Sequence, residues 1–277
     1  MQSGLKKVIS VGFTAALALT LAAWGSNHAS AKTTKTTTVK VGIVGADKRI
    51  WDAVDKKVQK DHIKIKVVEF SDYNKPNSAL QDGDIDLNAF QHQYFLDNWN
   101  KTHHGNLVAI GKTVLAPLAV YSQKIKGLKQ LKKGDTVSVP NDPTNEGRAL
   151  QLLEAAGLIK LDNKDLPTTQ DIKSSPKGIK VEAIDAAQLP KSLPDVAASV
   201  INSGVAVDAK LNPEKAIYRE PITKKSKPWI NIIVANKKDK NQKAYKQIVK
   251  AYQTKSIAKL IKKIYKSTET PAWNYKF

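Results

Sequence analysis

The feature that most restricts the fold is an alternation of strand-like and helix-like segments from Val39 onward. Val39–Val44 is a short apolar run typical of a buried strand, and Ile63–Phe70 alternates apolar with polar residues. The segment between them carries apolar residues at helical spacing, which are Ile50, Trp51, Val54 and Val58. A strand, a helix and a second strand in this order predict a mainly parallel sheet.

The same pattern continues along the first unit. A short helix is expected to begin at Ser78, and Ile85–Phe90 has an apolar residue at every second position, which predicts a third strand. Leu115–Tyr121 is rich in apolar residues and predicts one further strand.

A second unit begins with a predicted strand at Asp135–Val139. A loop rich in Pro and Asn then leads into a predicted helix at Glu146–Ala156, which Gly157 ends. A predicted strand at Ile179–Ala183 and an apolar run at Val196–Ile201 follow. The chain then has a predicted strand at Ile230–Ala235 and a long amphipathic helical stretch at Gln242–Tyr265. We therefore expect an α/β protein in which two lobes enclose a ligand cleft, with residues 39–120 and 235–277 in lobe 1 and residues 121–234 in lobe 2.

Composition removes several classes of chemistry. The 277 residues include no cysteine, so disulfides, thiolate metal sites and cysteine nucleophiles are excluded. The net charge is +20, but of the 45 basic residues only Arg49, Arg148 and Arg219 are arginines. Because base recognition relies on arginine forks, we expect a solvated lysine surface and no sequence-specific nucleic-acid binding. Loose attraction to cell-wall polyanions or anionic lipid is compatible with this charge.

Residues 1–31 have the layout of a signal peptide. Met1–Lys7 is basic, and Val8–Ala23 is apolar but shorter than the roughly 20 residues that a membrane span needs. Ala29-Ser30-Ala31 fits the small-residue rule for cleavage, which would leave residues 32–38 as a disordered Lys/Thr-rich tether. We expect cleavage and release, and retention as an uncleaved membrane anchor is the alternative.

A lipid anchor is in doubt because of one residue. Leu21–Gly25 has the form of a lipoprotein box, but Trp24 stands where the lipid-accepting cysteine would be. A tryptophan has no thiol to acylate.

Catalytic and metal-binding signatures are absent from the sequence. There is no nucleophile elbow, zinc-protease motif or phosphate-binding loop. The adjacent His103 and His104 cannot both face one metal from a regular element, and Asp82, Asp84 and Asp86 lack the glutamate of a calcium loop. We predict no catalytic residue, metal or cofactor, and we expect that the protein is not an enzyme.

A few residues suit the capture of a free amino acid. Arg148 lies in the first turn of a predicted helix, where its guanidinium and the helix dipole both favour a carboxylate. A surface position, with Arg148 paired to Glu146 or to another acidic residue, is the alternative. Phe90–Phe95 clusters aromatic residues with a histidine, although core packing explains it equally. Asn202 and Asn231 lie at the edges of apolar runs, where caps and turns also occur.

Several long motifs together resemble the NlpA-type methionine-binding lipoprotein family, the substrate-binding proteins of methionine ABC importers. They are Phe70–Asn77, Gly83–His92, Val139–Leu150, Ala187–Leu193, Val200–Asn202 and Trp229–Val234. The similarity covers essentially everything from Val39 onward.

The resemblance implies a two-lobed type II periplasmic-binding-protein fold. It implies that Arg148 holds the ligand carboxylate and that Asn202 and Asn231 contact the amino-acid backbone. It further implies that the side-chain pocket is walled by Tyr73, Phe90 and His92. The expected function is delivery of L- or D-methionine, or a closely related amino acid, to an ABC permease and its ATPase. The chain would be an exported monomer at the cell surface, associated with the membrane through its importer.

Departures from the family pattern leave alternatives open. Phe95 stands where the family often has tyrosine, and Val205 stands where it usually has an aromatic residue. A larger pocket at Val205 favours another small amino acid or a methionine-containing dipeptide. The lysine excess favours, as a different class, a basic cell-wall or surface adhesion protein. An enzyme on the same scaffold would have His92 without an obvious catalytic partner.

Overall fold

A computed structural model describes residues 35–45, 48–266 and 268–277. The predicted signal peptide, with Trp24, and the first residues of the predicted tether lie outside this range. The tether prediction is wrong for Thr37 and Thr38, because both belong to β1 (Thr37–Val44) and pair with Ile63 and Lys64 of the neighbouring strand.

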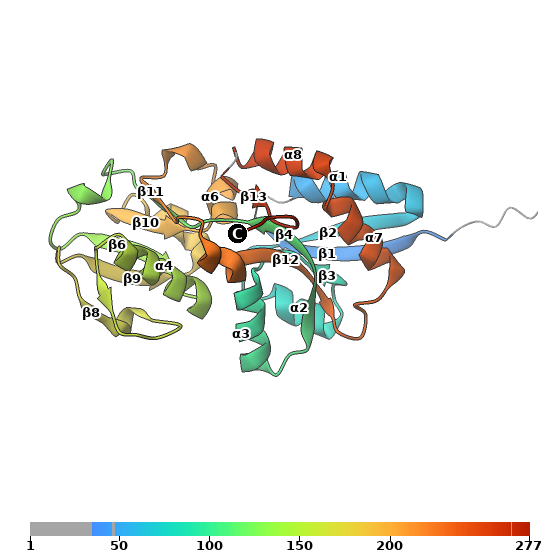
Figure 1. Cartoon of the computed structure of the whole chain (residues 1–277), viewed down its shortest axis with the longest axis horizontal. Helices are drawn as coiled ribbons and strands as arrows, with labels where there is room; N and C mark the ends of the chain where they lie inside the picture. The colour runs from blue at the N-terminus through green and yellow to red at the C-terminus, as the bar shows by residue number, and fades with distance from the viewer. Residues whose placement is uncertain (1–34, 46–47, 267) are drawn as a thin grey trace, which may run out of the picture. The chain divides into compact units, whose positions relative to one another are not determined.

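The first sheet has six strands in the order β13-β4-β12-β3-β1-β2 (Figure 1). Besides β1, its strands are β2 (Ile63–Phe70), β3 (Leu87–Asn88), β4 (Leu107–Leu115), β12 (Ile230–Asn236) and β13 (Thr270–Pro271). β1 pairs in parallel with β2 and β3, whereas β12 runs antiparallel to β3 and β4, and β13 antiparallel to β4. The sheet is therefore mixed, and the expected parallel arrangement holds only for β1, β2 and β3.

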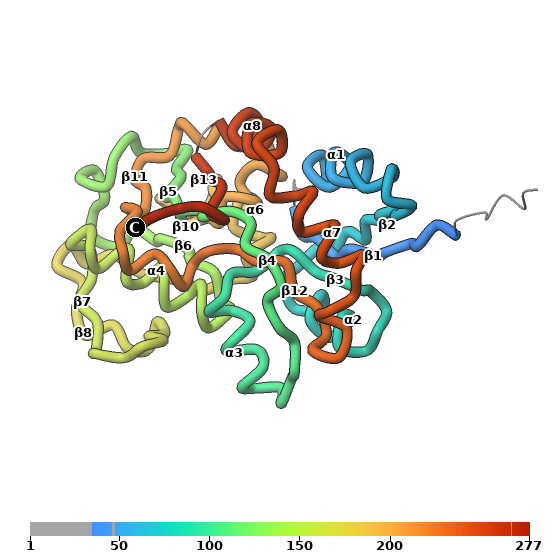
Figure 2. Tube along the Cα trace, turned by 45° about the vertical axis from the view of Figure 1, so that its right-hand side comes forward, coloured from blue at the N-terminus to red at the C-terminus, as the bar shows by residue number. Residues whose placement is uncertain are grey.

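Helices cover both faces of this sheet. One face carries α1 (Lys48–Val58), α7 (Lys243–Tyr252) and α8 (Lys255–Ile264), as Figures 1 and 2 show. The 3-10 turn η1 (Gln59–Asp61) follows α1. The other face carries α2 (Pro76–Asp82) and α3 (Gln93–His103).

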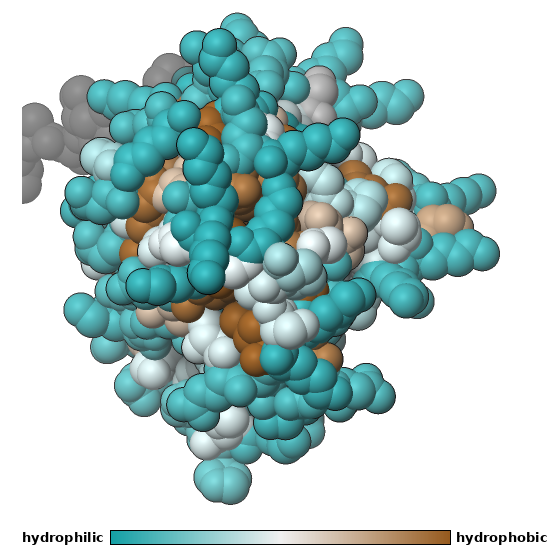
Figure 3. All heavy atoms as spheres, turned by 90° about the vertical axis from the view of Figure 1, so that its left-hand side faces the viewer, coloured by the Kyte–Doolittle hydropathy of each residue, from teal (hydrophilic) through white to brown (hydrophobic). Residues whose placement is uncertain are grey.

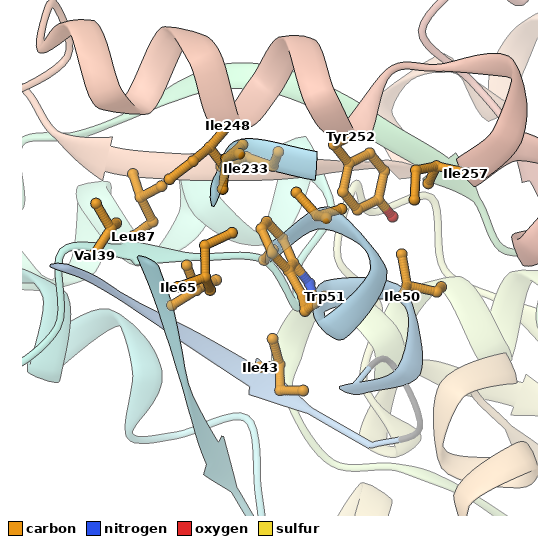
Figure 4. Close-up of a cluster of buried hydrophobic side chains, with 14 of the residues drawn as sticks. Val39, Ile43, Ile50, Trp51, Ile65, Leu87, Ile233, Ile248, Tyr252 and Ile257 are labelled. Carbon is orange, nitrogen blue, oxygen red and sulfur yellow. The ribbon is translucent and has the colours of Figure 1, made fainter. Parts of the chain in front are cut away.

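The core under α1 confirms its predicted apolar face. Ile50, Trp51, Val54 and Val58 are all buried, and each such side chain contributes roughly 1.5–3 kcal/mol. Trp51 lies at the centre of this cluster, with its ring centroid 5.3 Å from that of Tyr252 on α7 (Figure 4).

The second sheet has five strands in the order β11-β5-β10-β6-β9. They are β5 (Ala119–Tyr121), β6 (Thr136–Pro140), β9 (Lys180–Ile184), β10 (Ala198–Ile201) and β11 (Tyr218–Arg219). α4 (Pro143–Ala155) packs on one face, and α5 (Leu189–Ser192) and α6 (Ser203–Asp208) pack on the other. The small elements around it are β7 (Lys160–Leu161), β8 (Ile172–Ser174), η2 (Leu128–Gln130), η3 (Thr169–Asp171), η4 (Ala186–Gln188), η5 (Pro213–Lys215) and η6 (Lys224–Trp229).

The chain passes twice between the two sheets, at residues 116–118 and at residues 220–229. The predicted strand Leu115–Tyr121 is therefore two strands, β4 and β5, which belong to different sheets. Its apolar run is continuous because Leu118 is buried within the crossing itself. The expected lobe boundaries, 120/121 and 234/235, fall inside β5 and β12, and the division into lobes stays a prediction.

Other element boundaries also differ from the expectation. The strand predicted at Ile85–Phe90 is regular only at Leu87–Asn88, and the stretch Gln242–Tyr265 is broken at Gln253 and Thr254 into α7 and α8. The predicted helix at Glu146–Ala156 begins earlier, at Pro143, because the side chain of Asp142 caps it by accepting a hydrogen bond from the Asn145 N–H. A proline in the first turn fits this start.

Candidate functional site

A cavity between residues of the two sheets contains about 580 Å³ of empty space, part of it open to solvent. All the residues predicted to bind a ligand line this cavity, and they are Tyr73, Phe90, His92, Arg148, Asn202 and Asn231. The first three follow β2 and β3, Asn231 belongs to β12, Arg148 to α4, and Asn202 follows β10. The fold thus brings together side chains that are up to 158 positions apart, Tyr73 and Asn231.

Arg148 is buried, with 3% of its side chain exposed. Its Nε donates to Glu220 Oε1 at 2.9 Å, and its Nη2 donates to Glu220 Oε2 at 2.5 Å and to the Ala116 carbonyl at 3.1 Å. Its guanidinium carbon lies 4.7 Å from the ring centroid of Trp229, a cation–π distance. The alternative of a pair with an acidic residue is therefore correct for Glu220, although the pair is buried and not at the surface, whereas Glu146 accepts a hydrogen bond from the Thr169 N–H.

The pair with Glu220 changes how Arg148 can hold a ligand. The Nε–Nη2 edge, one of the two edges that can bind a carboxylate with two hydrogen bonds, is occupied by Glu220, and Nη2 also donates to the Ala116 carbonyl. Among the contacts of the described residues, none uses Nη1. A ligand carboxylate would therefore meet the Nη1 end of the guanidinium, and the positive charge there is already balanced by Glu220.

Asn145 organises the polar side of the cavity. Its Nδ2 donates to both carboxylate oxygens of Asp142, at 3.1 and 3.0 Å, which fixes the amide orientation because a carboxylate only accepts. Its Oδ1 then faces the cavity, where it accepts from Asn202 Nδ2 at 2.9 Å and lies 3.4 Å from His92 Nε2.

His92 is held as a neutral imidazole. Its Nδ1 accepts a hydrogen bond from the Phe95 N–H at 3.0 Å and caps α3, so the ring proton is on Nε2 and can be donated to Asn145. Burial and, to a smaller extent, the nearby positive charge of Arg148 together lower the pKa of His92 to about 3. This hydrogen bond joins α3 on the first sheet to α4 on the second.

Asn202 carries the clearest sign of a missing partner. It occupies the N-cap position of α6, but its side chain makes no capping hydrogen bond. Its Nδ2 donates to Asn145, and its Oδ1 is buried without a hydrogen-bond partner among the described residues. A buried acceptor without a donor costs about 1–3 kcal/mol, so this oxygen is suited to a ligand N–H.

The opposite wall is aromatic. The ring centroids of Tyr73 and Phe90 are 5.9 Å apart, and those of Phe90 and Phe95 are 5.6 Å apart. All three line the cavity, and Phe90 and Phe95 also pack against each other, so the pocket role of Phe90 stays a prediction. Val205 lies elsewhere, in an adjoining hollow of about 760 Å³ that shares only Val44 and Tyr73 with the cavity.

The loop under this wall is fixed by buried amides. Gln91 Nε2 donates to the side-chain oxygens of Asn77, at 2.5 Å, and Asn88, at 2.9 Å, and Asn77 Nδ2 donates back to Gln91 Oε1 at 2.9 Å. Asn231 joins the same region through a backbone bridge to His92.

Two important residues were not predicted. Asn145 lies within one of the motifs that carry the family resemblance, but no role was predicted for its side chain. Glu220 lies in the crossing between β11 and β12, and no pattern in the sequence separates it from the other acidic residues.

Comparison with known proteins agrees with this architecture. The family model described as NlpA lipoprotein matches residues 39–273. The chain belongs to the NlpA lipoprotein family. The D-methionine-binding lipoprotein MetQ of Escherichia coli K12, also similar to the chain, is 42% identical over 245 residues, covering 85% of this chain and 88% of that protein.

Solved structures similar to this family member confirm the fold. A nutrient binding protein from Burkholderia cenocepacia, solved bound to methionine, is 43% identical with a TM-score of 0.81, covering 84% of this chain and 99% of that chain. The substrate binding protein of a methionine transporter from Streptococcus pneumoniae is 39% identical with a TM-score of 0.81, covering 87% of this chain and 97% of that chain. The predicted type II periplasmic-binding-protein fold is therefore correct.

Two kinds of feature are absent from the described residues. Within residues 35–45, 48–266 and 268–277, no group of three or more His, Cys, Asp and Glu side chains is placed to hold a metal ion. No helix in this part of the chain is long and apolar enough to cross a membrane.

Proposed function

We propose that the chain is an extracytoplasmic substrate-binding protein that captures methionine, or a closely related amino acid, for an ABC importer. The observation that carries this proposal is one cavity in which buried Arg148, the unpaired Asn202 Oδ1 and an aromatic wall face each other. Two similar proteins are named a D-methionine-binding lipoprotein and a nutrient binding protein bound to methionine.

The cavity fits both ends of an amino-acid zwitterion. The ligand carboxylate would accept hydrogen bonds from Arg148 Nη1, and the ammonium would donate to Asn202 Oδ1. Because Glu220 balances the charge of Arg148, the site as a whole favours a ligand without net charge over a simple anion.

The aromatic wall fits an apolar, flexible side chain. Thioether sulfur makes favourable contacts with aromatic rings, each of about 0.3–1.5 kcal/mol. Tyr73, Phe90 and Phe95 supply three such rings on one side of the cavity.

Ligand binding would be coupled to closure of the cleft. Arg148 touches both crossings between the sheets, through the Ala116 carbonyl and through Glu220, whose Oε2 also accepts from the Leu118 N–H at 3.0 Å. A ligand on Arg148 therefore acts at the two segments that would bend as a hinge, and the His92–Asn145 hydrogen bond holds the closed cleft. The closed, loaded monomer would dock on the permease and its ATPase.

The proposed location is outside the cell membrane, at the cell surface. The signal-peptide layout of residues 1–31 supports export, and the relatives are named lipoproteins. Trp24 provides no thiol for a lipid, so the proposed membrane association is through the importer.

Calorimetric titration tests this function. The purified protein, unfolded and refolded to remove carried ligand, is titrated with L- and D-methionine. We expect micromolar or tighter binding that Arg148→Ala and Arg148→Lys abolish and that a control, Arg219→Ala, preserves. Absence of binding to methionine and to every other amino acid in a panel would refute the proposal.

A methionine-containing dipeptide is the second candidate, and the hollow lined by Val205 favours it. This hollow adjoins the cavity at Val44 and Tyr73 and could hold a second residue. Val205→Tyr should weaken dipeptide binding and leave methionine binding unchanged. Equal effects on both ligands would count against a dipeptide subsite.

A further inference from the structure

The helices on one face of the first sheet carry a concentration of positive charge. Residues 237–266 contain eleven lysines and one acidic residue, Asp239, so this stretch supplies a net charge of +10, half of the chain total of +20. The ten lysines from Lys237 to Lys263 are exposed, and their side chains form no ion pair or hydrogen bond with the described residues.

Helical spacing arranges these lysines in rows. Lys243, Lys246 and Lys250 follow one another at intervals of three and four residues on α7, so they share one side of the helix. The apolar side of each helix faces the core, as shown by Ile248 on α7 and Ile257 on α8 (Figure 4). The large apolar side chains exposed in the described chain are Ile222, Tyr275 and Phe277, and none lies on these helices.

A groove lies beside these rows, between the end of α1 and α7. It is lined by Lys56, Lys57, Lys60 and Lys250, with Asp61 as the single acidic residue, and its empty space of about 1050 Å³ includes open solvent. The remaining lining residues are Gln247, Ala251 and Thr254. None of these residues lines the ligand cavity, so the groove is a separate site.

We propose that this groove binds a linear polyanion that carries phosphate charges repeated along a chain. Lysines on both walls can reach a thin chain lying in the groove, whereas the flat surface of a bilayer cannot enter it. Lysine ammonium groups are hydrated point charges that neutralise phosphates without reading bases. The contact is therefore electrostatic, weakened by salt and indifferent to sequence.

This site is independent of amino-acid capture. In an exported chain whose Trp24 cannot accept a lipid, it provides reversible retention at a polyanionic surface. The outer face at the other end of the molecule also presents mainly hydrophilic side chains, which offer a matched control (Figure 3).

The test measures binding of fluorescently labelled inorganic polyphosphate by anisotropy at several salt concentrations. The groove variant is Lys56→Glu, Lys60→Glu and Lys250→Glu, and the control is Lys126→Glu, Lys129→Glu and Lys132→Glu. All six side chains are exposed and have no described partner, so the two variants change the charge equally. We expect the groove variant to bind about tenfold more weakly than the control, with a slope of log affinity against log salt that is smaller by about 2.

Further arms separate the possible sources of anion. Orthophosphate at equal total phosphate should fail to displace the polymer, and phosphatidylglycerol vesicles should bind both variants alike. Equal polymer binding by the two variants, displacement by orthophosphate, or vesicle binding without polymer binding would each overturn the proposal. Lys56→Gln, Lys60→Gln and Lys250→Gln should give an intermediate loss, which keeps the test valid where the reversed charges prevent folding. Methionine titration of the same variants should be unchanged.

Discussion

The two sides of the cavity are stabilised in different ways. On the side of the first sheet, the wall is aromatic and the amides beneath it, Gln91, Asn77 and Asn88, donate and accept among themselves. On the side of the second sheet, Arg148 is paired with Glu220, but Asn202 keeps a buried acceptor with no donor from the described residues. The first side is complete without a ligand and the second is not.

This difference separates two tasks. We expect the open polar groups of the second side to govern affinity for amino acids as a class, because every amino-acid backbone can satisfy them. We expect the aromatic wall of the first side to govern the choice among amino acids, because it faces the ligand side chain. Variants on each side should therefore give different patterns of loss.

The largest effect is expected from Glu220→Ala. It leaves the Arg148 guanidinium buried without its anion, which should lower the free energy of unfolding by about 3–5 kcal/mol. Urea denaturation measures this loss. The control is Glu214→Ala, which removes an exposed pair with Lys266 and should cost less than about 1 kcal/mol. Similar decreases in the free energy of unfolding for both variants would show that the Arg148–Glu220 pair stabilises the protein no more than an exposed pair does.

A smaller effect is expected from Asn202→Leu. It removes the acceptor proposed for the ligand ammonium, and a hydrogen bond to a charged group contributes about 1.5–3 kcal/mol, so methionine affinity should fall about 10- to 150-fold. Stability should change by less than about 1 kcal/mol, because the lost bond to Asn145 is offset by removal of an unpaired buried oxygen. Calorimetry and urea denaturation on the same samples separate the two quantities, and unchanged affinity would contradict the role of Asn202.

His92 predicts a dependence of stability on pH. Its pKa is about 3 in the folded protein and about 6.5 in the unfolded chain, so between these values the unfolded state binds the proton and the folded state does not. The contribution of His92 is fully present above about pH 6.5 and is lost as the pH falls toward 3, at up to about 1.4 kcal/mol per pH unit. His92→Gln should flatten the curve of unfolding free energy against pH from 6.5 to 4.5.

The control for His92 is His104→Asn, which removes an exposed histidine at a position of positive φ that asparagine tolerates. This variant should keep the slope of the unmodified protein. A curve for His92→Gln that matches it would mean that His92 is not held neutral by burial.

The smallest effect is expected on the aromatic side. Phe95→Leu keeps an apolar side chain but removes one ring of the wall, which should lower methionine affinity less than about tenfold. Affinity for alanine should stay the same, because its side chain is too short to use the ring. An equal loss of affinity for methionine and for alanine would contradict the proposed division of tasks between the two sides.

Local patterns explain why most elements could be predicted. The prediction of the buried face of α1 was correct at Ile50, Trp51, Val54 and Val58, because apolar residues at helical spacing all lie on the side of the helix that packs on the core. The crossing at residues 116–118 could not be predicted, since its buried Leu118 continues the apolar run of β4 into β5 and conceals the change of sheet. The break at Gln253 and Thr254 was missed for a similar reason, because α7 and α8 both keep their apolar faces on one core.

The site was predictable only where a motif carried it. Arg148, Asn202 and His92 lie in motifs shared with the family, and the structure places them on one cavity. The partner of Arg148 was not predictable, because Glu220 is 72 residues away and the pairing arises from tertiary structure. The role of Arg148 in holding the ligand carboxylate stays a prediction, and Nη1 is the nitrogen that the contacts of the described residues leave for it.

The central claim is that Asn202 Oδ1 receives the ligand ammonium while Arg148 holds the carboxylate. It is tested most directly by titrating the unmodified protein and Asn202→Leu with methionine and with its analogue lacking the amino group. We predict that loss of the amino group weakens binding to the unmodified protein at least tenfold more than binding to Asn202→Leu. An equal loss in both proteins would show that the ammonium is bound elsewhere and would contradict the proposed geometry.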